Sequence, residues 1–505
     1  MIDVILTGIA SALTLTNLAL ICLGVFTGIV VGAIPGLNGP MGIAIAIPLT
    51  FVLDPLTAIA FLVGINKGAT FGGSISAILI NVPGAAEAMA TTFDGYPLAR
   101  KGKALKALKM ALYASVVGDT FSDLVLILVA APFAILALTM GPAEITALMA
   151  FALTFIAAVV GESMMKGLIA GALGLFAATI GLDPEASTPR MTFDILELEE
   201  GIPLLAMVIG MLALSEIMIQ IENHVRDSAT GEAVRINAFD RNTPHQDRIV
   251  TWPEFKSCFR TIMRSAVIGT VIGAIPGLGA TLAGFLGYGA AKRASKNPEE
   301  FGNGALNGVA AAESANSATV GANLIPTLAL GIPGNLSAAI LLSALIIHGL
   351  TPGPLIFEQH GQVLYGLFAA MMVANLINLG IGQLGLRLFA WVISLPHQFV
   401  HPVIVLLCFS GAYLITQSMF AVCLMVGFAI VGYVMRKLDF SIVAFLIAFI
   451  LGPLFEDALR QTLVLFGDRP QDLLYRPIAL FFVAITAYSL WRIGFRSKPK
   501  FLQEP

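Results

Sequence analysis

Four Pro-Gly steps stand out among the residues whose chemistry could bind a ligand, because each would interrupt a helix inside an apolar stretch. They are Pro35-Gly36, Pro83-Gly84, Pro276-Gly277 and Pro333-Gly334. Proline removes a backbone donor, and glycine tolerates the unusual backbone conformations that follow a break. A broken helix exposes N–H groups and a positive dipole end that favour anions, while its other end offers carbonyl oxygens to a cation. Paired breaks are therefore typical of a site for an anion and a coupling cation.

Small polar residues surround these breaks, and they are the predicted ligands. The predicted substrate-binding residues are Gly36, Asn38, Ser74, Asn81, Gly84, Thr281, Asn316, Ser317, Asn323, Gly334 and Asn335. The predicted coupling-ion residues are Asn66, Thr70, Glu313 and Thr319, and Lys67 is the candidate charge partner. The alternative is that these small residues only let helices pack closely. Close packing explains Gly-x-x-x-Gly spacing, but it poorly explains Pro-Gly breaks that cluster with Asn and Ser.

Ionisable residues inside apolar stretches are functional candidates by default. Lys67 could attract a carboxylate, or its long side chain could extend from a helix end toward the membrane surface. Glu313 could bind a coupling cation or proton, or it could cap an interfacial helix. Asp119 and Asp123 lie one helical turn apart, and they could form a cation site or face another subunit or a polar crevice.

The composition indicates that these residues belong to a membrane protein. Of the 505 residues, 57% are hydrophobic and 12% are charged, and the mean hydropathy is +0.89. Soluble globular chains carry about 25% charged residues. Three of the uncharged stretches are residues 6–33, 124–142 and 363–385, and a helix needs about 20 residues to cross the bilayer. We therefore expect an all-α polytopic membrane protein with about 10–14 hydrophobic segments.

The sequence also repeats itself. Residues 28–37 return as residues 269–278, and a second pair of motifs, at residues 69–84, returns at residues 318–334. Chance would rarely produce two matches in the same order. We predict the following parts: a first membrane repeat at 1–221, a polar linker at 222–264, a second membrane repeat at 265–491 and a basic cytoplasmic tail at 492–505.

The distribution of Lys and Arg predicts that the two repeats face opposite sides of the membrane. Cytoplasmic loops are enriched in these residues. The loop after the second motif is basic in the first repeat, at residues 100–109, but the matching residues 348–362 contain no Lys or Arg. After the first motif the bias is reversed, because residues 292–296 are basic. This pattern is expected of inverted-topology repeats. The breaks could be re-entrant hairpins or full spans that unwind midway.

Several longer stretches carry a family resemblance: residues 32–37, 72–84, 94–97 with the basic residues after them, 273–279 and 308–354. In these stretches the chain resembles the large membrane subunit of the tripartite tricarboxylate transporters. The resemblance implies a bacterial inner-membrane permease that works with a small membrane subunit and a periplasmic solute-binding protein. It also implies carboxylate substrates and a sodium or proton gradient as the driving force. The chain departs from the family pattern at residues 85–89, where Glu87 stands, which weakens the expectation of a tricarboxylate.

The sequence therefore predicts the large permease subunit of a secondary transporter that imports a small carboxylate by symport. We expect no cofactor other than a coupling ion such as Na⁺, membrane lipid as the surroundings, and no nucleic-acid partner. The alternatives are a permease for another solute class, a membrane enzyme without a recognised motif, or a channel. HExxH, GxSxG and GxxxxGK[ST] motifs do not occur, so we predict no enzymatic activity. We also expect the broken helices to move together in an elevator-like or rocking motion.

Overall fold

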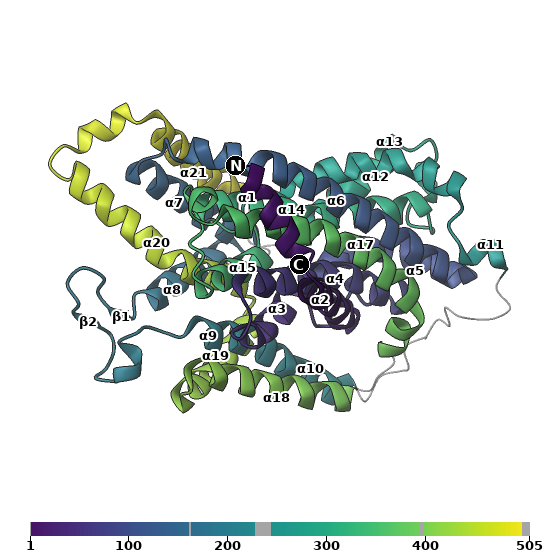
Figure 1. Cartoon of the computed structure of the whole chain (residues 1–505), viewed down its shortest axis with the longest axis horizontal. Coiled ribbons are helices and arrows are strands. Elements are labelled where there is room, and N and C mark those ends of the chain that lie inside the picture. Colours follow the sequence, from purple (N-terminus) through teal and green to yellow (C-terminus); the bar gives the residue numbers. More distant parts are fainter. Residues whose placement is uncertain (1, 161–162, 228–243, 394–396, 497–505) are drawn as a thin grey trace, which may run out of the picture. The chain divides into compact units, whose positions relative to one another are not determined.

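Helices make up most of this computed structural model, which describes residues 2–160, 163–227, 244–393 and 397–496 (Figure 1). The only strands among the described residues are β1 (Gly181–Leu182) and β2 (Pro189–Arg190), which pair antiparallel. The prediction of an all-α chain is confirmed. The chain divides into two compact units, residues 1–133 with 216–415 and residues 134–215 with 416–505. Each unit draws on both predicted repeats, and the first contains all four Pro-Gly steps.

The first unit holds most of the long helices. Its elements are α1 (Ile2–Ala12), α2 (Leu15–Ala33), α3 (Gly39–Ala46), η1 (Ile47–Thr50), α4 (Pro55–Ile80), η2 (Ala86–Ala88), α5 (Met89–Leu98), the π-helical η3 (Ala99–Lys103), most of α6 (Ala104–Ala137), most of α10 (Ser215–Asp227), α11 (His245–Arg248), α12 (Trp252–Gly273), α13 (Gly279–Ala294), η6 (Pro298–Glu300), α14 (Leu306–Leu330), α15 (Leu336–Ile347), α16 (Ile356–Gln359), α17 (Gly361–Val392) and nearly all of α18 (His397–Thr416).

The second unit is smaller. Besides the strands it contains α7 (Pro142–Val160), α8 (Met164–Ala178), η4 (Leu196–Leu198), α9 (Leu204–Ile209), the π-helical η5 (Gly210–Leu214), α19 (Met419–Lys437), α20 (Ile442–Phe466), η7 (Pro470–Tyr475) and α21 (Pro477–Arg496). Within it, α20 packs on α8 and α7. Arg460 of α20 bonds to Asp183 near the strands, at 2.5 Å, and to Glu456, at 2.7 Å. The backbone N–H of Ala186 and the Arg460 guanidinium hold the pKa of Asp183 below its usual range.

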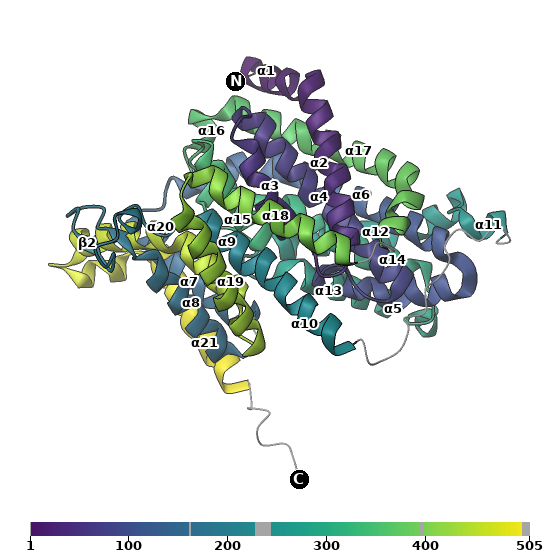
Figure 2. The same ribbon diagram turned by 90° about the horizontal axis from the view of Figure 1, so that it is seen from below.

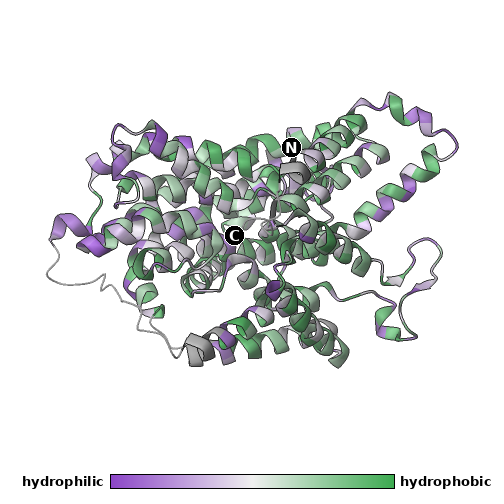
Figure 3. Cartoon of the chain, turned by 180° about the vertical axis from the view of Figure 1, so that it is seen from behind, coloured by the Kyte–Doolittle hydropathy of each residue, from purple (hydrophilic) through white to green (hydrophobic). Residues whose placement is uncertain are grey.

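Seven helical segments among the described residues are long and apolar enough to cross a membrane. They are Leu15–Ala33, Pro55–Ile80, Ala86–Ala137, Leu204–Glu222, Gly361–Val392, Met419–Lys437 and Ile442–Phe466. Shorter apolar helices such as Leu336–Ile347 accompany them. Hydrophobic residues cover most of the long helices, and hydrophilic residues gather mainly at helix ends and in connecting loops (Figure 3). The chain is therefore a multi-pass membrane protein.

Each Pro-Gly step interrupts a helix, as predicted. In the first repeat the breaks separate α2 from α3 and α4 from η2, and in the second they separate α12 from α13 and α14 from α15. The equivalent breaks also share their backbone conformation. Gly36 and Gly277 both have φ +85°, and α4 and α14 both end in a left-handed residue, Asn81 with φ 58° and Gly331 with φ 70°.

Glycine allows the helices on either side of the breaks to approach closely. Gly28 and Gly32 of α2 lie against the backbone of Ile65 and Ala69 of α4, where a side-chain carbon would have no room. In the second repeat Gly269 of α12 lies against Ala315 of α14 in the same way. The pairs α2–α4 and α12–α14 thus use small-residue packing, and in Figure 2 α2 and α4 run side by side. Close packing explains these glycines, but not the polar residues at the breaks.

The two repeats interlock through their broken segments. Helix α3 of the first repeat packs on α15 of the second, and α13 of the second packs on α5 of the first. Helix α5 also packs on α14, as α15 packs on α4. If α3 is exchanged with α13, α4 with α14 and α5 with α15, the contact of α3 with α15 becomes that of α13 with α5. The contact of α5 with α14 likewise becomes that of α15 with α4. This reciprocity agrees with a twofold relation of the repeats, but their inverted topology in the membrane stays a prediction.

The predicted linker and tail are only partly described. Residues 228–243 of the linker and 497–505 of the tail lie outside the described residues. The C-terminal part of the predicted linker forms the first half of α12, which starts with a capping box. There the Thr251 hydroxyl accepts the Glu254 N–H, and the Glu254 carboxylate accepts the Thr251 N–H. Nothing in the structure tests the predicted boundaries further.

Asp94 ties the two repeats together at the start of α14. One oxygen of its carboxylate, Oδ1, accepts the backbone N–H groups of Gly302, Gly304 and Ala305 at 2.8–2.9 Å. Asp94 lies on α5, which follows the break in the first repeat, whereas the three donors precede the broken helix of the second. A single buried carboxylate therefore fixes where α14 begins.

We predict that Asp94→Ala lowers the free energy of unfolding by about 1.5–3 kcal/mol, because hydrogen bonds to a charged acceptor are lost and buried N–H groups become unpaired. Asp94→Asn keeps an oxygen at the same place and should retain most of this stability. Denaturant unfolding of the detergent-solubilised protein measures both. Equal stability of Asp94→Ala and the wild type would show that the carboxylate does not hold this loop.

Candidate functional site

One face of α14 carries most of the predicted ligands of the second repeat. Glu313, Asn316, Ser317 and Asn323 recur at helical spacing, and all four side chains are buried. Among the described residues, neither amide atom of Asn316 finds a hydrogen-bond partner, nor does Ser317 Oγ or Asn323 Oδ1. Buried polar side chains are nearly always hydrogen-bonded in folded proteins. This row of unpartnered groups therefore marks a place where a polar ligand or ion would complete the bonding.

The Glu313 carboxylate sits where the two repeats meet. It accepts the hydroxyls of Thr91 from α5 and Ser115 from α6, the latter at 3.0 Å. Ser74 of α4 also faces it. Among the described residues, no Lys or Arg is paired with Glu313, so hydroxyl dipoles alone surround a fully buried acid. A carboxylate in such a place binds a cation or carries a proton.

Two of the predicted coupling-ion residues, Thr70 of α4 and Thr319 of α14, bond to carbonyls of their own helices. Asn66, Thr70 and Ser74 recur on one face of α4. The Thr70 hydroxyl donates to the Asn66 carbonyl at 3.0 Å, and the Thr319 hydroxyl donates to the Asn316 carbonyl at 2.7 Å. The two threonines occupy equivalent places in the repeated motif, but Thr70 bonds the carbonyl four residues before it and Thr319 the carbonyl three residues before it.

Asparagine caps two of the helices that follow a break. Asn38 accepts the Met41 N–H of α3 at 3.0 Å, and Asn335 accepts the Ala338 N–H of α15 at 2.9 Å. Each cap uses the carboxamide oxygen, so the Nδ2 donors of Asn38 and Asn335 take no part in the cap.

Asn81 is exposed and ends α4 in the left-handed conformation, as Gly331 ends α14. Its position is explained by the helix end.

Helix α13 begins without a side-chain cap, unlike α3 and α15. Its first residue, Gly279, has φ +68° and open space where a side chain would be, and Thr281 lies in its first turn. The N–H of Gly277 donates to the carbonyl of Gly334 at 2.8 Å, which joins the two breaks of the second repeat. The N–H groups of the first turn of α13 are therefore not bonded by a capping side chain and favour an anion.

The remaining predicted glycines hold the breaks together. Gly334 lies against Asn323 Oδ1, so the α14 break is next to an unpartnered amide oxygen. Gly84 donates its N–H to Gly73 at 3.3 Å and packs against Gly32. Gly36 faces Gln220 of α10, whose Nε2 reaches the Pro35 carbonyl at 3.5 Å. These glycines permit the close approach of backbones that the break geometry requires.

Lys67 does not extend to the membrane surface. Its side chain is 0% exposed, and its Nζ lies 3.0 Å from Asp119 Oδ1, 2.8 Å from Asp123 Oδ2 and 2.9 Å from Asn375 Oδ1. Asn375 also donates to Asp123 Oδ2 at 2.7 Å. We call Lys67, Asp119, Asp123 and Asn375 the buried ion cluster. Because three protein oxygens accept the hydrogen bonds of its ammonium group, Lys67 is not directed at Asn316 and the other predicted ligands.

The sequence predicts members of the ion cluster but not the cluster itself. It relates Asp119 to Asp123 by their spacing of one turn, but Asn375 lies 308 residues from Lys67 and gives no sequence signal of its own. A count of charges in the apolar segments relates Lys67 to Asp119 and Asp123. Two acids one turn apart in an apolar helix need a nearby cation, and Lys67 stands in an equally apolar segment.

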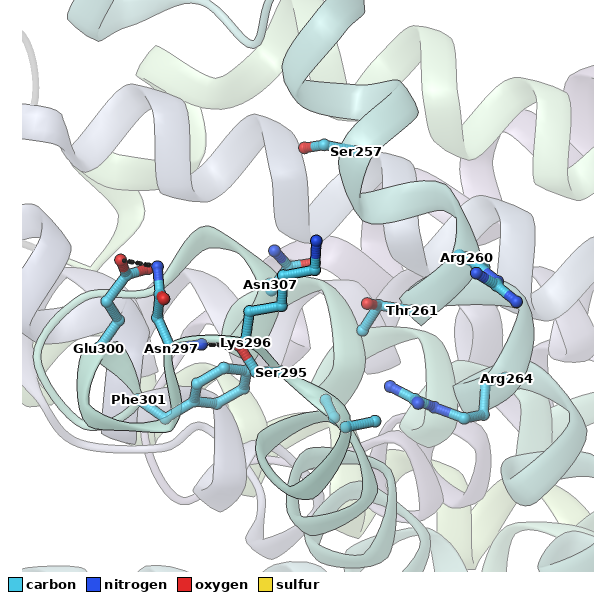
Figure 4. Close-up of a pocket in the computed structure, with 12 residues that line it drawn as sticks. Ser257, Arg260, Thr261, Arg264, Ser295, Lys296, Asn297, Glu300, Phe301 and Asn307 are labelled. Carbon is cyan, nitrogen blue, oxygen red and sulfur yellow. Dashed lines mark hydrogen bonds between the residues drawn. The ribbon is translucent and has the colours of Figure 1, made fainter.

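A polar pocket of about 860 Å³ lies elsewhere in the first unit, between α12, the end of α13 and the start of α14 (Figure 4). Arg260, Arg264 and Lys296 line it, and its acid, Glu300, accepts a hydrogen bond from Asn297 at 2.9 Å. None of the residues predicted from the Pro-Gly motifs lines this pocket. It is therefore separate from the candidate site at the breaks.

Comparison with known proteins places this geometry in a family. Residues 18–447, which include all four breaks, match the TctA family of tripartite tricarboxylate transporters. The chain belongs to this family. The TctA chains are the large membrane subunits of tripartite systems, which also contain a small membrane subunit and a periplasmic binding protein. The resemblance read from the motifs is thus confirmed.

Two relatives come from Agrobacterium vitis. An uncharacterised 52.8 kDa protein in the TAR-I ttuC' 3' region is 32% identical over 478 residues, which cover 95% of this chain and 93% of the relative. An uncharacterised protein in the TAR-II ttuC' 3' region is 35% identical over 211 residues, which cover 42% of this chain and 87% of the relative. No solved structure matches this chain.

We predict that Lys67→Met lowers the free energy of unfolding by about 3–5 kcal/mol, because it removes the only cation that bonds the buried carboxyl groups of Asp119 and Asp123 in the described structure. The control is Lys101→Met, since Lys101 is exposed and bonds a single carbonyl, that of Asn303, so its loss should cost about 0–1 kcal/mol. Unfolding in detergent compares the two. If Lys67→Met is as stable as Lys101→Met, the ion cluster does not stabilise the fold.

Proposed function

We propose that this chain is the permease subunit of a binding-protein-dependent secondary transporter that imports a small carboxylate with a sodium or proton gradient. The observation that carries the proposal is the Asn316 amide, which is buried on the broken helix α14 with neither polar atom bonded among the described residues. Family membership supports a transporter rather than an enzyme. A carboxylate substrate would accept from amide and hydroxyl donors such as Asn316 Nδ2 and Ser317 Oγ.

The anion end of the site is proposed at the start of α13 and the adjoining face of α14. The uncapped N–H groups of α13 and the hydroxyl of Thr281 are donors, and Asn316 and Ser317 supply more. Gly279 leaves open space beside them. No Lys or Arg is required, because several oriented N–H and O–H dipoles in a water-poor place bind a carboxylate well.

The coupling ion is proposed to bind beside the substrate, at Glu313. Its carboxylate would supply the charge, and the hydroxyl oxygens of Thr91 and Ser115, which bond it, would be further oxygen ligands. Asn66, Thr70 and Thr319 on α4 and α14 are the other proposed coupling-ion residues. A cation here would compensate the buried acid and draw the anionic substrate to the site. Substrate and ion would then bind cooperatively, which is the requirement of symport.

We further propose that the two breaks of each repeat move as one body, in an elevator-like or rocking motion, in a bacterial inner membrane with the C-terminus in the cytoplasm. The reciprocal packing of α3 on α15 and α13 on α5 supports joint movement, because neither repeat can shift its broken segments without displacing those of the other. The small membrane subunit and a periplasmic binding protein are the proposed partners.

The test is uptake of labelled carboxylates into proteoliposomes that contain this chain, its small membrane partner and the binding protein. We predict that Asn316→Ala reduces the apparent substrate affinity about 10–100-fold, because a hydrogen bond to a charged group is worth about 1.5–3 kcal/mol. The matched control is Asn307→Ala on the same helix, which lines the surface pocket and should leave uptake unchanged.

Two outcomes would contradict parts of this proposal, the role of Asn316 and the carboxylate substrate class. Equal losses in Asn316→Ala and Asn307→Ala would show a general effect on α14 and would remove Asn316 from the site. Saturable uptake of an uncharged solute, with no uptake of any carboxylate by the folded complex, would retain the permease and contradict the substrate class.

A further inference from the structure

The buried ion cluster has one more negative charge than positive. It consists of one ammonium group, Lys67, and two carboxylates, Asp119 and Asp123, and none of the three side chains is more than 2% exposed. Asn375 contributes only dipoles. Inside a membrane-spanning segment an uncompensated charge is strongly unfavourable. The cluster as it stands is therefore short of one positive charge.

The hydrogen bonds of the cluster show which carboxylate oxygen lacks a donor. Lys67 Nζ has three oxygen partners, which use its three N–H donors. Asp123 Oδ2 receives both Lys67 and Asn375, whereas Asp123 Oδ1 has no partner among the described residues. Gly321 of α14 lies directly against this oxygen. One buried carboxylate oxygen is thus left without a donor.

Within the described part of the chain, the contacts of the cluster include no further charged group that could compensate it. Its charged members come from α4 and α6, whereas the residues that α17 and α14 present to it, Asn375 and Gly321, are neutral. The nearest other titratable group along these contacts is Glu313, which bonds Ser115, one turn before Asp119 on α6. Glu313 is itself an acid, so it adds to the deficit rather than relieving it.

A metal ion does not fit the deficit, but a proton does. The ammonium group of Lys67 already occupies the position between the carboxylates and Asn375 that a cation would take. A proton needs no such position, because it bonds to one carboxylate oxygen and converts the pair to one acid and one carboxylate. The cluster then holds one positive and one negative charge, as a buried ion pair should.

We propose that the buried ion cluster carries one exchangeable proton, shared by Asp119 and Asp123, and that this proton is a coupling ion of transport. The assignment rests on the transport function proposed above and adds a proton at a place separate from Glu313. In the step, the O–H bond of one aspartic acid breaks, the proton passes to water on one side of the membrane, and the carboxylate is protonated again from the other side.

The cluster is placed to sense the state of the substrate site. Lys67 follows Asn66 on α4, and Gly321, which presses on Asp123, lies between Ser317 and Asn323 on α14. Helix α6 contacts α14 a turn away, where Gly118 meets Ser314. A shift of α4 against α6 and α17 would separate the cluster, and a shift of α14 would uncover Asp123 Oδ1, so that either movement opens the cluster to water. Release of the proton is then linked to movement of the two broken helices.

The experiment uses the reconstituted three-component complex and compares wild type, Asp123→Asn, Asp119→Asn and the control Asp94→Asn. Carboxylate counterflow without a gradient measures transport itself. Accumulation under an inward proton gradient, in the absence and presence of Na⁺, measures coupling, and a dye inside the vesicles reports proton entry per substrate. We expect each cluster variant to keep counterflow within about threefold of the wild type, to lose proton-driven accumulation at least tenfold and to show no proton entry. Asp94→Asn should keep both.

A stability measurement on the same variants separates the proposal from a purely structural cluster. Asp123→Asn leaves one lysine and one acid, so a cluster that holds a proton loses no charge balance, and the variant should be at least as stable as the wild type at neutral pH. A fully ionised cluster predicts the opposite, because Lys67 would lose a charged partner. Clear destabilisation by both substitutions would therefore overturn the proposal.

Two transport results would also overturn it: unchanged proton entry in both cluster variants, or wild-type accumulation that follows the Na⁺ gradient and is indifferent to pH. A failure of the proposed transport function would give a result different from these two. In that case the wild-type complex shows no carboxylate counterflow at all, whatever the gradient.

Discussion

A backbone N–H or C=O group inside a membrane must find a partner in the protein, and this constraint governs the structure. The chain breaks four helices in its apolar segments and therefore has to shield the ends it creates. It does so by pairing the breaks with one another. Gly277 donates to Gly334 within the second repeat, and Asn38 and Asn335 cap α3 and α15. The short helices after the breaks pack on helices of the other repeat. Interlocking of the repeats is thus a consequence of the breaks.

The same constraint explains why the candidate site lies where it does. Some buried polar groups near the breaks stay unbonded, and these include Asn316, Ser317 and Asn323 on α14 and the uncapped start of α13. Close packing by glycine removes the space that water would need around α2, α4, α12 and α14. A ligand is then the available partner for these groups. Glu313 adds a charge to the same region, and its neighbours are hydroxyls from the first repeat.

The sequence predicted the elements of this arrangement but not the pairings. Proline and glycine act locally, so the positions of all four breaks could be read from their residue types, and so could the clustering of Asn, Ser and Thr beside them. Lys67 was less predictable, because its role depends on Asp119, Asp123 and Asn375, which come from two other helices. Asp94 is similar, since its three donors lie more than 200 residues away. Contacts of this kind are set by how helices pack, and a single sequence does not contain them.

The proposed substrate site lies at the helix breaks of the first unit. An experimental structure of the complex with a bound carboxylate tests it most directly. We expect density for the carboxylate between the start of α13 and the face of α14 that carries Asn316 and Ser317. Density in the surface pocket at Arg260, Arg264 and Lys296, with the breaks unchanged and unliganded, would contradict it.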